Sequence, residues 1–275
     1  MLKYDPIYRY SNRPTRLAIA AITILSLTAC SISKDGAPRR HVNVASIPDA
    51  KPKVEPRSAG GNPSSYEVFG KTYYVMQDSN NYVERGIASW YGTKFHGNKT
   101  SNGETYSMYK MTAAHKSLPI PTYVQVTNIK NGRQVIVRVN DRGPFHNNRI
   151  IDLSYVAAKK LGIVGTGTGL VEVRSINPST WKRGKRQAER RTSPVPNGDD
   201  SLYIQAGAFT SQYNATKLKH QLNALFPDKR IRLAQNSQDQ LYRVRVGPLT
   251  TVDEADRVAQ TISDNGYPTP QVILE

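Results

Sequence analysis

The chain has 275 residues, enough for one large domain or two small ones, and its 38% hydrophobic and 21% charged content neither demands a membrane bundle nor forces disorder. Its formal net charge of +17 at pH 7 favours a polyanionic partner, although charge alone does not separate nucleic acid, anionic lipid and acidic wall polymer. The single cysteine, Cys30, excludes an intramolecular disulfide framework.

The N-terminus has the pattern of a signal peptide. Residues 1–16 are polar and partly basic, and an apolar run of eleven residues, LAIAAITILSL, follows at 17–27. That run is shorter than the roughly 20 residues of a membrane-spanning helix. It ends in LTAC at 27–30, which resembles the bacterial lipobox, where the cysteine is acylated and becomes the first mature residue. We therefore expect residues 1–29 to be a lipoprotein signal peptide and Cys30 to carry the lipid.

The residues after the cysteine indicate where the protein resides. Ser31 follows Cys30, and the resemblance to lipoproteins associates aspartate at this place with retention in the inner membrane. We therefore expect an outer-membrane lipoprotein on the periplasmic side, and less so an inner-membrane one. Residues 30–65 hold prolines, glycines and serines without an apolar period, which predicts a semi-extended tether.

Residues 66–176 are predicted to form a small β-barrel domain. Short alternating runs typical of strands lie at 86–91, 122–128, 134–139 and 170–176. Asn131-Gly132 marks a tight hairpin turn between the second and third runs. One short helix is expected, capped by Ser154 and ended by Gly162.

A basic, proline-containing linker is predicted at 177–200, and residues 201–275 then repeat the order strand, helix, strand. The expected strands are 202–209, 231–235, 241–247 and 270–274. Ser211 caps the first helix, and Thr251 caps the second. This order predicts an α+β ferredoxin-like βαββαβ domain, with two helices on one face of the sheet and the other face free.

Four side chains of the β domain could carry acid–base chemistry: Glu104, His115, Asp141 and Asp152. Glycoside cleavage needs a carboxylic acid near the leaving oxygen, and often a second polar partner. Each residue also has a plainer interpretation, namely a surface charge, a loop hydrogen bond, a turn and a helix cap respectively. The five histidines show no HExxH spacing, so a zinc peptidase is disfavoured, and we expect neither a metal nor a cofactor.

Several motifs of this domain occur in the order seen in the rare lipoprotein A family, which the chain resembles. They are GIASWYGTKFHGNKTSNGETY at 86–106, AAH at 113–115, VRVNDRGPF at 137–145 and RIIDLS at 149–154. The resemblance implies a double-psi β-barrel that acts as a septal-ring lytic transglycosylase. It implies that Asp141 is the acid, that Glu104 and His115 are catalytic polar residues of the groove, and that Asp152 contacts substrate.

Residues 201–275 resemble the SPOR domain through YIQAGAF and YRVRVGP. This resemblance implies binding of glycan strands that have lost their stem peptides and are enriched at division septa. Alternation places Leu241 and Arg243 on the open face of the sheet, and Gln205 is the matching polar position of the first strand. We assign these three residues to substrate binding.

The combined expectation is an endolytic lytic transglycosylase that cuts the β-1,4 bond between N-acetylmuramic acid and N-acetylglucosamine at the septum. In this scheme Asp141 protonates the glycosidic oxygen, then accepts the C6 hydroxyl proton as a 1,6-anhydro ring closes. Expected partners are glycan strands, a membrane through acylated Cys30, and divisome proteins, but not nucleic acid. The alternative is a non-catalytic septal peptidoglycan-binding lipoprotein with the same folds.

Overall fold

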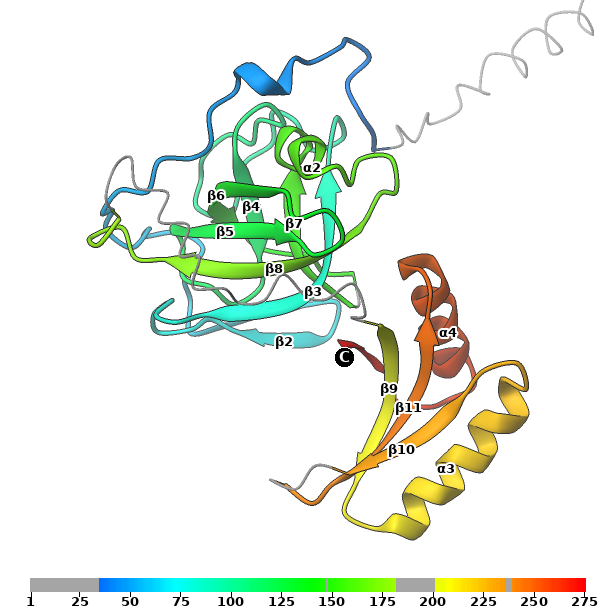
Figure 1. The fold of residues 1–275 in the computed structure, drawn as a ribbon. Coiled ribbons are helices and arrows are strands. Elements are labelled where there is room, and N and C mark those ends of the chain that lie inside the picture. Colours follow the sequence, from blue (N-terminus) through cyan, green and yellow to red (C-terminus); the bar gives the residue numbers. More distant parts are fainter. Residues whose placement is uncertain (1–34, 147, 182–200, 236–238) are drawn as a thin grey trace, which may run out of the picture. The chain divides into compact units, whose positions relative to one another are not determined.

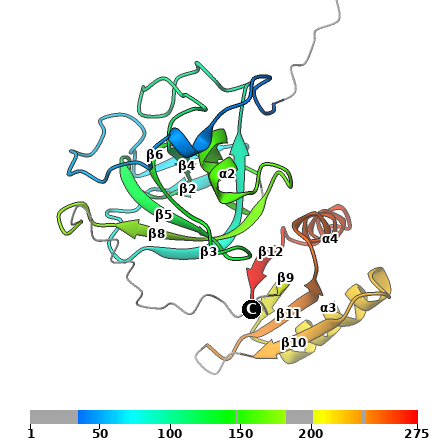
Figure 2. The same ribbon diagram turned by 45° about the horizontal axis from the view of Figure 1, so that its top comes forward.

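A computed structural model describes residues 35–146, 148–181, 201–235 and 239–275 (Figures 1 and 2). The predicted signal peptide, Cys30 and most of the predicted basic linker lie outside these residues. Within the described ranges, no helix is both long enough and apolar enough to cross a membrane.

Six strands close into a barrel in the order β3-β7-β4-β6-β5-β8. They are β3 (Val83–Tyr91), β4 (Thr112–His115), β5 (Thr122–Asn128), β6 (Gln134–Asp141), β7 (Arg149–Ser154) and β8 (Gly169–Ile176). The pairs β3–β7 and β4–β6 are parallel, and the other pairs are antiparallel. The predicted double-psi β-barrel is confirmed, and two of its strands, β4 and β7, were not predicted.

Alternate burial explains why the central strands form. Val135, Val137 and Val139 of β6 are buried in the barrel core, whereas Ile136 and Arg138 between them are only half-buried. This period of two is the strand pattern seen in the sequence. The predicted hairpin joins β5 to β6, and its Gly132 has a φ of +68°, which glycine adopts without steric cost.

Helix α2 (Tyr155–Leu161) begins and ends as the sequence predicts. The Ser154 hydroxyl accepts a hydrogen bond from the backbone N–H of Ala157 at 3.4 Å, and Gly162 ends the helix in the left-handed conformation. The helix packs its buried side into the barrel core. It follows β7 directly and therefore fixes the end of that strand.

The described part of the predicted tether, residues 35–65, is hydrogen-bonded to the barrel. The Ala50 N–H donates to the Ile136 carbonyl at 3.0 Å, and the Ser58 N–H donates to the Ile120 carbonyl at 2.8 Å. These contacts are made by backbone groups, which leave no periodic apolar signal in the sequence. A short helix, η1 (Val44–Ser46), and a hairpin of β1 (Ser65–Val68) and β2 (Lys71–Tyr74) complete this N-terminal part.

The C-terminal domain is the predicted ferredoxin-like βαββαβ unit. Its elements are β9 (Leu202–Phe209), α3 (Gln212–Leu225), β10 (Ile231–Gln235), β11 (Tyr242–Leu249), α4 (Val252–Asp264) and β12 (Gln271–Leu274). The antiparallel sheet has the order β10-β11-β9-β12, and both helices cover one face (Figure 2). The other face is open, as predicted.

Both helices of this domain have the predicted caps. The Ser211 hydroxyl accepts from the Asn214 N–H at 3.4 Å, and the Thr251 hydroxyl accepts from the Glu254 N–H at 3.1 Å. Glu254 in turn accepts from the Thr250 N–H at 2.8 Å, one residue before the position expected in a capping box. These contacts fix where each helix starts.

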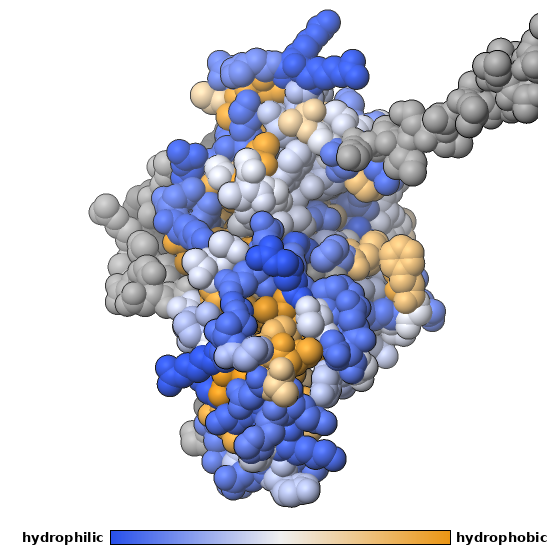
Figure 3. Space-filling model, turned by 90° about the vertical axis from the view of Figure 1, so that its right-hand side faces the viewer, coloured by the Kyte–Doolittle hydropathy of each residue, from blue (hydrophilic) through white to orange (hydrophobic). Residues whose placement is uncertain are grey.

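On the face drawn in Figure 3, hydrophilic side chains predominate and hydrophobic ones gather in small patches. Among the described residues, the most exposed large apolar side chain is Phe69, at the turn of the β1–β2 hairpin, with 92% of its surface accessible.

Candidate active site

A bulge at the end of β6 aims Asp141 away from the barrel core. On β4, Ala113 pairs with Val139 and Ala114 pairs with Asp141, so Asn140 has no partner and forms the bulge. A bulge of this kind re-aims the side chains that follow it. Val139 is therefore buried in the core, whereas Asp141 shares the face of Ala114.

Asp152 lies on the same face, two strands away from Asp141. It pairs with Ala114 of β4 on one side and with Ser89 of β3 on the other. Ser89, Asp152, Ala114 and Asp141 thus form a row across four strands, and paired residues of neighbouring strands share a face. Since strands lie about 4.8 Å apart, the Cα atoms of the two aspartates are about 10 Å apart, with only the methyl group of Ala114 between them.

One carboxylate oxygen of Asp141 is fully engaged. Its Oδ1 accepts hydrogen bonds from the N–H of Ser101 at 2.8 Å, the hydroxyl of Ser101 at 2.6 Å and the N–H of Arg142 at 2.8 Å. Three donors thus converge on this one oxygen. No residue in the described ranges donates to Oδ2, so this oxygen can meet a substrate.

Arg142 anchors the turn that carries Asp141. Its guanidinium donates to the carbonyls of Gly61 at 2.8 Å, His115 at 3.0 Å and Leu118 at 2.6 Å. A planar guanidinium with several fixed donors suits this role, because it ties three chain segments to one point. The turn after β6 is therefore held by the N-terminal segment as well as by the barrel.

Glu104 is linked to the end of β6 through three neighbouring side chains. Asn140 donates to Oε2 of Glu104 at 2.9 Å, Arg138 donates to both carboxylate oxygens at 2.8 and 3.0 Å, and Asn102 donates to Oε1 at 3.0 Å. Burial alone would raise the pKa of Glu104, but these hydrogen bonds and the charge of Arg138 lower it below the ordinary value. Glu104 is therefore ionised at neutral pH and cannot donate a proton there.

Arg138 is held on its other side by Glu55, which belongs to the predicted tether. Glu55 accepts from Nε and Nη2 of Arg138, both at 3.0 Å, and from the Tyr123 hydroxyl at 2.5 Å. Arg138 thus bridges two carboxylates, and the placement of Glu104 depends on Glu55. The sequence offered no signal for this residue, because Glu55 stands among prolines and lysines without a motif.

Burial raises the pKa of the Asp152 carboxyl. The Ser89 hydroxyl, which donates to Oδ1 of Asp152, and the positive charges of Arg149 and Lys116 lower it by less. A carboxyl in this setting keeps its proton to a higher pH than an ordinary aspartate, which is what a general acid requires. The sequence assigned Asp152 to substrate contact, and the structure places it on the same face as Asp141.

His115 is buried, with 2% of its surface exposed, and the hydrogen bonds of its imidazole go to Tyr82, Ser117 and Leu118 rather than to Asp141 or Glu104. Its Nδ1 accepts from the backbone N–H groups of Ser117 at 3.1 Å and Leu118 at 3.0 Å, so Nε2 carries the hydrogen and donates to the Tyr82 hydroxyl at 2.8 Å. Burial, followed by the charges of Arg142 and Lys116, lowers the pKa of His115 to about 3. The imidazole is neutral at pH 7.

Three buried polar atoms near the row have no hydrogen-bond partner in the described part of the chain. They are the hydroxyls of Tyr91 and Thr112 and Oδ1 of Asn140. Thr112 precedes Ala114 by two residues, and Tyr91 follows Ser89 by two, so both side chains share the face of the row. Buried groups without a partner are unusual and often mark a site that a ligand completes.

The hydroxyl of Tyr91 is close to both aspartates. Burial, then Tyr106, then the negative charges of Asp141 and Asp152, raise the pKa of Tyr91 well above its ordinary value. Tyr91 therefore keeps its proton, and its hydroxyl is buried beside that of Thr112, which lowers the pKa of Tyr91 by less than burial raises it. The sequence motif contained this tyrosine but no feature that distinguished it from a core residue.

In the C-terminal domain, the three predicted binding residues occupy different settings. Gln205 pairs with Arg245 across β9 and β11, rather than with Arg243. Arg243 is paired with Asp239, with one contact at 2.9 Å, and half-buried Leu241 lies just before β11. The open face is therefore lined by cations that already have acidic partners.

Replacing Glu104 with glutamine should reduce activity by roughly 10-fold, less than the 10²- to 10⁴-fold typical of losing an acid or base, because Glu104 positions neighbours. The pKa of Glu104 is lower in the folded protein than in the unfolded chain. Its contribution to the free energy of unfolding is therefore full above the pKa of the unfolded chain, and it is lost as the pH falls through the pKa of the folded protein. The melting temperature of the variant should therefore lie below wild type at pH 7, and the gap should close as the pH falls through the lowered folded pKa of Glu104.

The matched control for this variant is Glu67→Gln, which removes an exposed glutamate of β1 outside the site. It should change neither activity nor the pH dependence of melting. A stability gap for Glu104→Gln that is the same at pH 3 and pH 7 would contradict the charge-based explanation.

Two family models match the chain. Residues 83–174 match the model described as lytic transglycolase, and residues 198–274 match the model of the SPOR domain. The first range covers the barrel, with the row of aspartates. The second covers the C-terminal domain.

Characterised proteins match over most of their length. The chain is 42% identical over 288 residues to the endolytic peptidoglycan transglycosylase RlpA of Pseudomonas aeruginosa strain PAO1, covering 86% of this chain and 84% of that protein. It is 38% identical over 259 residues to the protein of the same name from Vibrio cholerae serotype O1, covering 92% and 94%. Among solved structures, the RlpA SPOR domain from Pseudomonas aeruginosa is 32% identical and covers 26% of this chain and 96% of that chain, with a TM-score of 0.24.

Proposed function

The chain belongs to the RlpA family of endolytic peptidoglycan transglycosylases, and from that premise we propose that it cuts peptidoglycan glycan strands without water. The bond cut is the β-1,4 link from N-acetylmuramic acid to N-acetylglucosamine, and the product carries a 1,6-anhydro ring on the muramic acid. The SPOR domain supports binding to the same polymer, with strands stripped of stem peptides as the preferred form.

The observation that carries this proposal is the row formed by Asp152, Ala114 and Asp141. Two carboxyl groups lie on either side of Ala114 in this row, and their surroundings differ. Burial favours the protonated form of Asp152, whereas Asp141 meets three hydrogen-bond donors. Two carboxyl groups with such different environments divide the roles of acid and anion between them.

The proton transfers use Asp152. Its carboxyl gives a proton to the glycosidic oxygen as the bond from that oxygen to C1 of the muramic acid breaks. The C6 hydroxyl of the same sugar then attacks C1, and its proton passes to the Asp152 carboxylate, which returns to its starting form. Because the nucleophile belongs to the substrate, no water is consumed, and one carboxyl can serve both steps.

Asp141 stabilises the charge that develops on the substrate, and its neighbours hold the residues of the site in position. Positive charge develops at C1 as the glycosidic bond breaks, and the free Oδ2 of the Asp141 carboxylate can stabilise it. Glu104 holds Asn140 and, through Arg138, the end of β6.

The sequence alone assigned proton transfer to Asp141 and a catalytic role to His115. The environments of the two aspartates favour Asp152 for the proton, because burial raises the pKa of its carboxyl. His115 supports β3 through Tyr82 and the turn after β4 through two backbone N–H groups, so we assign it to positioning. The test is the product: purified protein on peptide-free glycan should release 1,6-anhydro ends, identified by mass.

We further propose that the protein is an outer-membrane lipoprotein on the periplasmic side, enriched at the division septum near divisome proteins. The lipobox-like LTAC at 27–30 and Ser31 support the anchor and its membrane. The SPOR domain supports the septum, where peptide-free strands would be its ligand. Several acyl chains on one cysteine anchor a protein stably, since each buried CH₂ contributes about 0.8 kcal/mol.

Replacing Cys30 with serine should leave an unlipidated and uncleaved precursor, because the thiol that receives the lipid is gone. Mass spectrometry of the protein from membrane fractions should show the loss of the lipid and the retention of residues 1–29. The control Ser33→Ala should be processed like wild type. Normal cleavage and outer-membrane fractionation of Cys30→Ser would contradict the anchor.

A further inference from the structure

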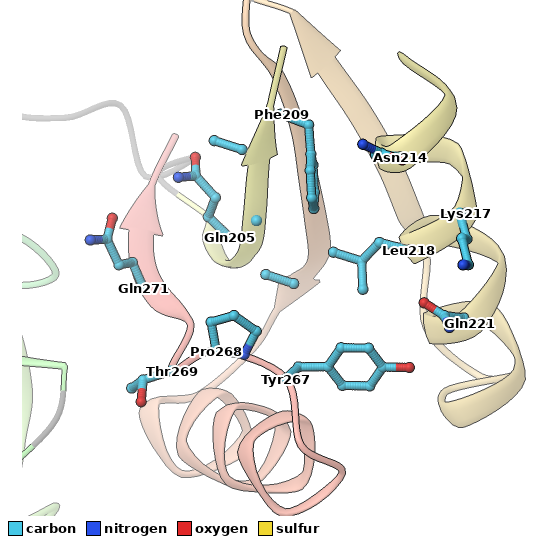
Figure 4. A pocket seen from close by; sticks show the side chains of 13 residues that line it. Gln205, Phe209, Asn214, Lys217, Leu218, Gln221, Tyr267, Pro268, Thr269 and Gln271 are labelled. Carbon is cyan, nitrogen blue, oxygen red and sulfur yellow. The ribbon is translucent and has the colours of Figure 1, made fainter. Parts of the chain in front are cut away.

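A pocket of about 630 Å³ opens beside β9 in the C-terminal domain (Figure 4). Five consecutive residues of this strand line it, from Gln205 to Phe209. A bulge at Ala206, between Gln205 paired with Arg245 and Gly207 paired with Val244, interrupts the alternation of side chains within this run. The pocket lies where β9 extends beyond β12, and it shares Gln205 with the open sheet face.

The edge is free because β12 is short. It pairs with β9 only from Leu202 to Gln205, so from Ala206 to Phe209 this edge of β9 has no neighbouring strand among the described residues. An unpaired strand edge presents N–H and C=O groups that can bind a ligand containing amides. The pocket therefore offers main-chain hydrogen bonds as well as side chains.

The other walls combine apolar surface with amides and one cation. The side chains of Phe209, Leu218 and Tyr267 face the same space in Figure 4. Helix α3 adds Asn214, Lys217 and Gln221, which recur at helical spacing and so lie on one face. Flat apolar surface beside amide groups suits a sugar ring, whose faces are apolar and whose edge carries hydroxyls.

Lys217 is a cation without an acidic partner in the described part of the chain. It is exposed and makes no ion pair there. On the open face, by contrast, Arg243 is paired with Asp239, and both Arg232 and Arg245 are paired with Glu275. A carboxylate ligand would therefore meet less competition from the protein's own acids at Lys217.

We propose that this edge pocket binds an N-acetylated amino-sugar chain, with the strand edge pairing to its acetamido groups and Lys217 pairing to its lactyl carboxylate. An acetamido group is a secondary amide, with the same donor and acceptor as a peptide unit, so it can pair with a strand edge as a peptide does. The volume lies within the roughly 300–1,000 Å³ of typical ligand sites, enough for a short part of the strand.

This inference rests on the proposed function and makes it more specific. The lactyl carboxylate of muramic acid is an anion only when no stem peptide is attached, because the peptide is joined to it through an amide bond. A cation at the pocket would therefore distinguish peptide-free strands from strands that carry peptides. Lys217 supplies that discrimination.

The test uses residues 35–275, which form one compact unit, with Asp152→Asn so that the glycan is not consumed. Three probes are titrated: a peptide-free tetrasaccharide, the same tetrasaccharide with its carboxylates amidated, and chitotetraose, which has no lactyl group. Amidation should weaken binding to the parent by roughly 3- to 10-fold, the scale of one charge-assisted hydrogen bond that is partly exposed.

Lys217→Gln should bind the free acid as weakly as the parent binds the amidated form, and amidation should cost it nothing more. Lys219→Gln is the matched control, since it removes a charge from the same helix but lies outside the pocket, and it should behave like the parent. In NMR spectra, the amide signals of Ala206 to Phe209 should shift on addition of glycan.

The parent could bind the glycan while Lys217→Gln still binds the free acid more tightly than the amidated form. That result would overturn the proposed pocket and leave the proposed function standing. NMR shifts confined to the open sheet face around Arg243 and Arg245 would likewise overturn the proposed pocket and leave the proposed function standing. Failure of the parent to bind peptide-free glycan at all would count against the proposed function of this domain too. If the β9 amides respond to an extended peptide and not to glycan, the pocket is a peptide site and the inference is wrong.

Discussion

Asp152→Asn should lower the rate of glycan cleavage by about 10²- to 10⁴-fold, the usual contribution of a general acid or base. Asparagine keeps the oxygen that accepts from the Ser89 hydroxyl but has no acidic proton to give. Cleavage is measured on peptide-free glycan by counting anhydro ends. The control is Asp78→Asn, an exposed carboxylate outside the site, which should retain full activity.

The pH dependence of this variant separates catalysis from structure. The activity of wild type should fall as the pH rises through the raised pKa of Asp152, because the neutral acid is lost. The residual activity of Asp152→Asn should lack this decrease. If the activity of Asp152→Asn falls at alkaline pH as that of wild type does, the decrease is caused by the titration of another group.

The thermal stability of Asp152→Asn should stay the same or rise, whereas its activity falls. The pKa of Asp152 is higher in the folded protein than in the unfolded chain. Its contribution to the free energy of unfolding is therefore full below the pKa of the unfolded chain, and it is lost as the pH rises through the pKa of the folded protein. The asparagine side chain of the variant carries no charge to bury, so the variant should unfold at the same temperature as wild type or higher at pH 8, and at the same temperature at pH 3. A variant that melts lower at both pH values would indicate a structural role for Asp152.

Much of the fold could be predicted because strands with one buried face leave a pattern of period two. β5 and β6 were visible through alternating valines, and the caps of α2, α3 and α4 through Ser154, Ser211 and Thr251. β4 was not, because its four residues, TAAH, are too short and too small to alternate. β7 was missed because Ile150 and Ile151 are adjacent, which breaks the period.

The site was harder to predict because its geometry depends on pairing between distant segments. Asp141 was identified from its position after a strand, but the bulge at Asn140 that aims it is not visible in the sequence. The link from Asp152 to Asp141 passes through Ala114, on a strand that was not predicted. His115 was selected for its residue type, which says nothing about its burial.

The support for Glu104 had no local signal at all. Arg138 looked like the outward residue of an alternating strand, and Glu55 like part of a tether. Only the folded chain brings the two charges together, with two hydrogen bonds at 3.0 Å. Polar contacts between segments 83 residues apart leave no periodic trace, whereas buried faces do.

Asp141→Asn should reduce cleavage by about 10²- to 10³-fold, the scale of losing one preorganised electrostatic contact with the transition state. Asparagine keeps an oxygen for the donors of Ser101 and Arg142, so the turn should stay in place and glycan binding should survive. What is lost is the negative charge that faces C1. Circular dichroism and glycan binding provide the controls for folding and for the SPOR domain.

A glycoside with a nitrophenolate leaving group distinguishes the two aspartates. Such a group departs without a proton, so Asp152→Asn should recover most of its activity on this substrate, whereas Asp141→Asn should not, because charge at C1 develops in either case. The reverse result would return the proton to Asp141, as the sequence alone suggested. Reducing ends in place of anhydro ends would mean that water attacks C1, and no product from well-folded wild type would favour a protein that binds glycan without cutting it.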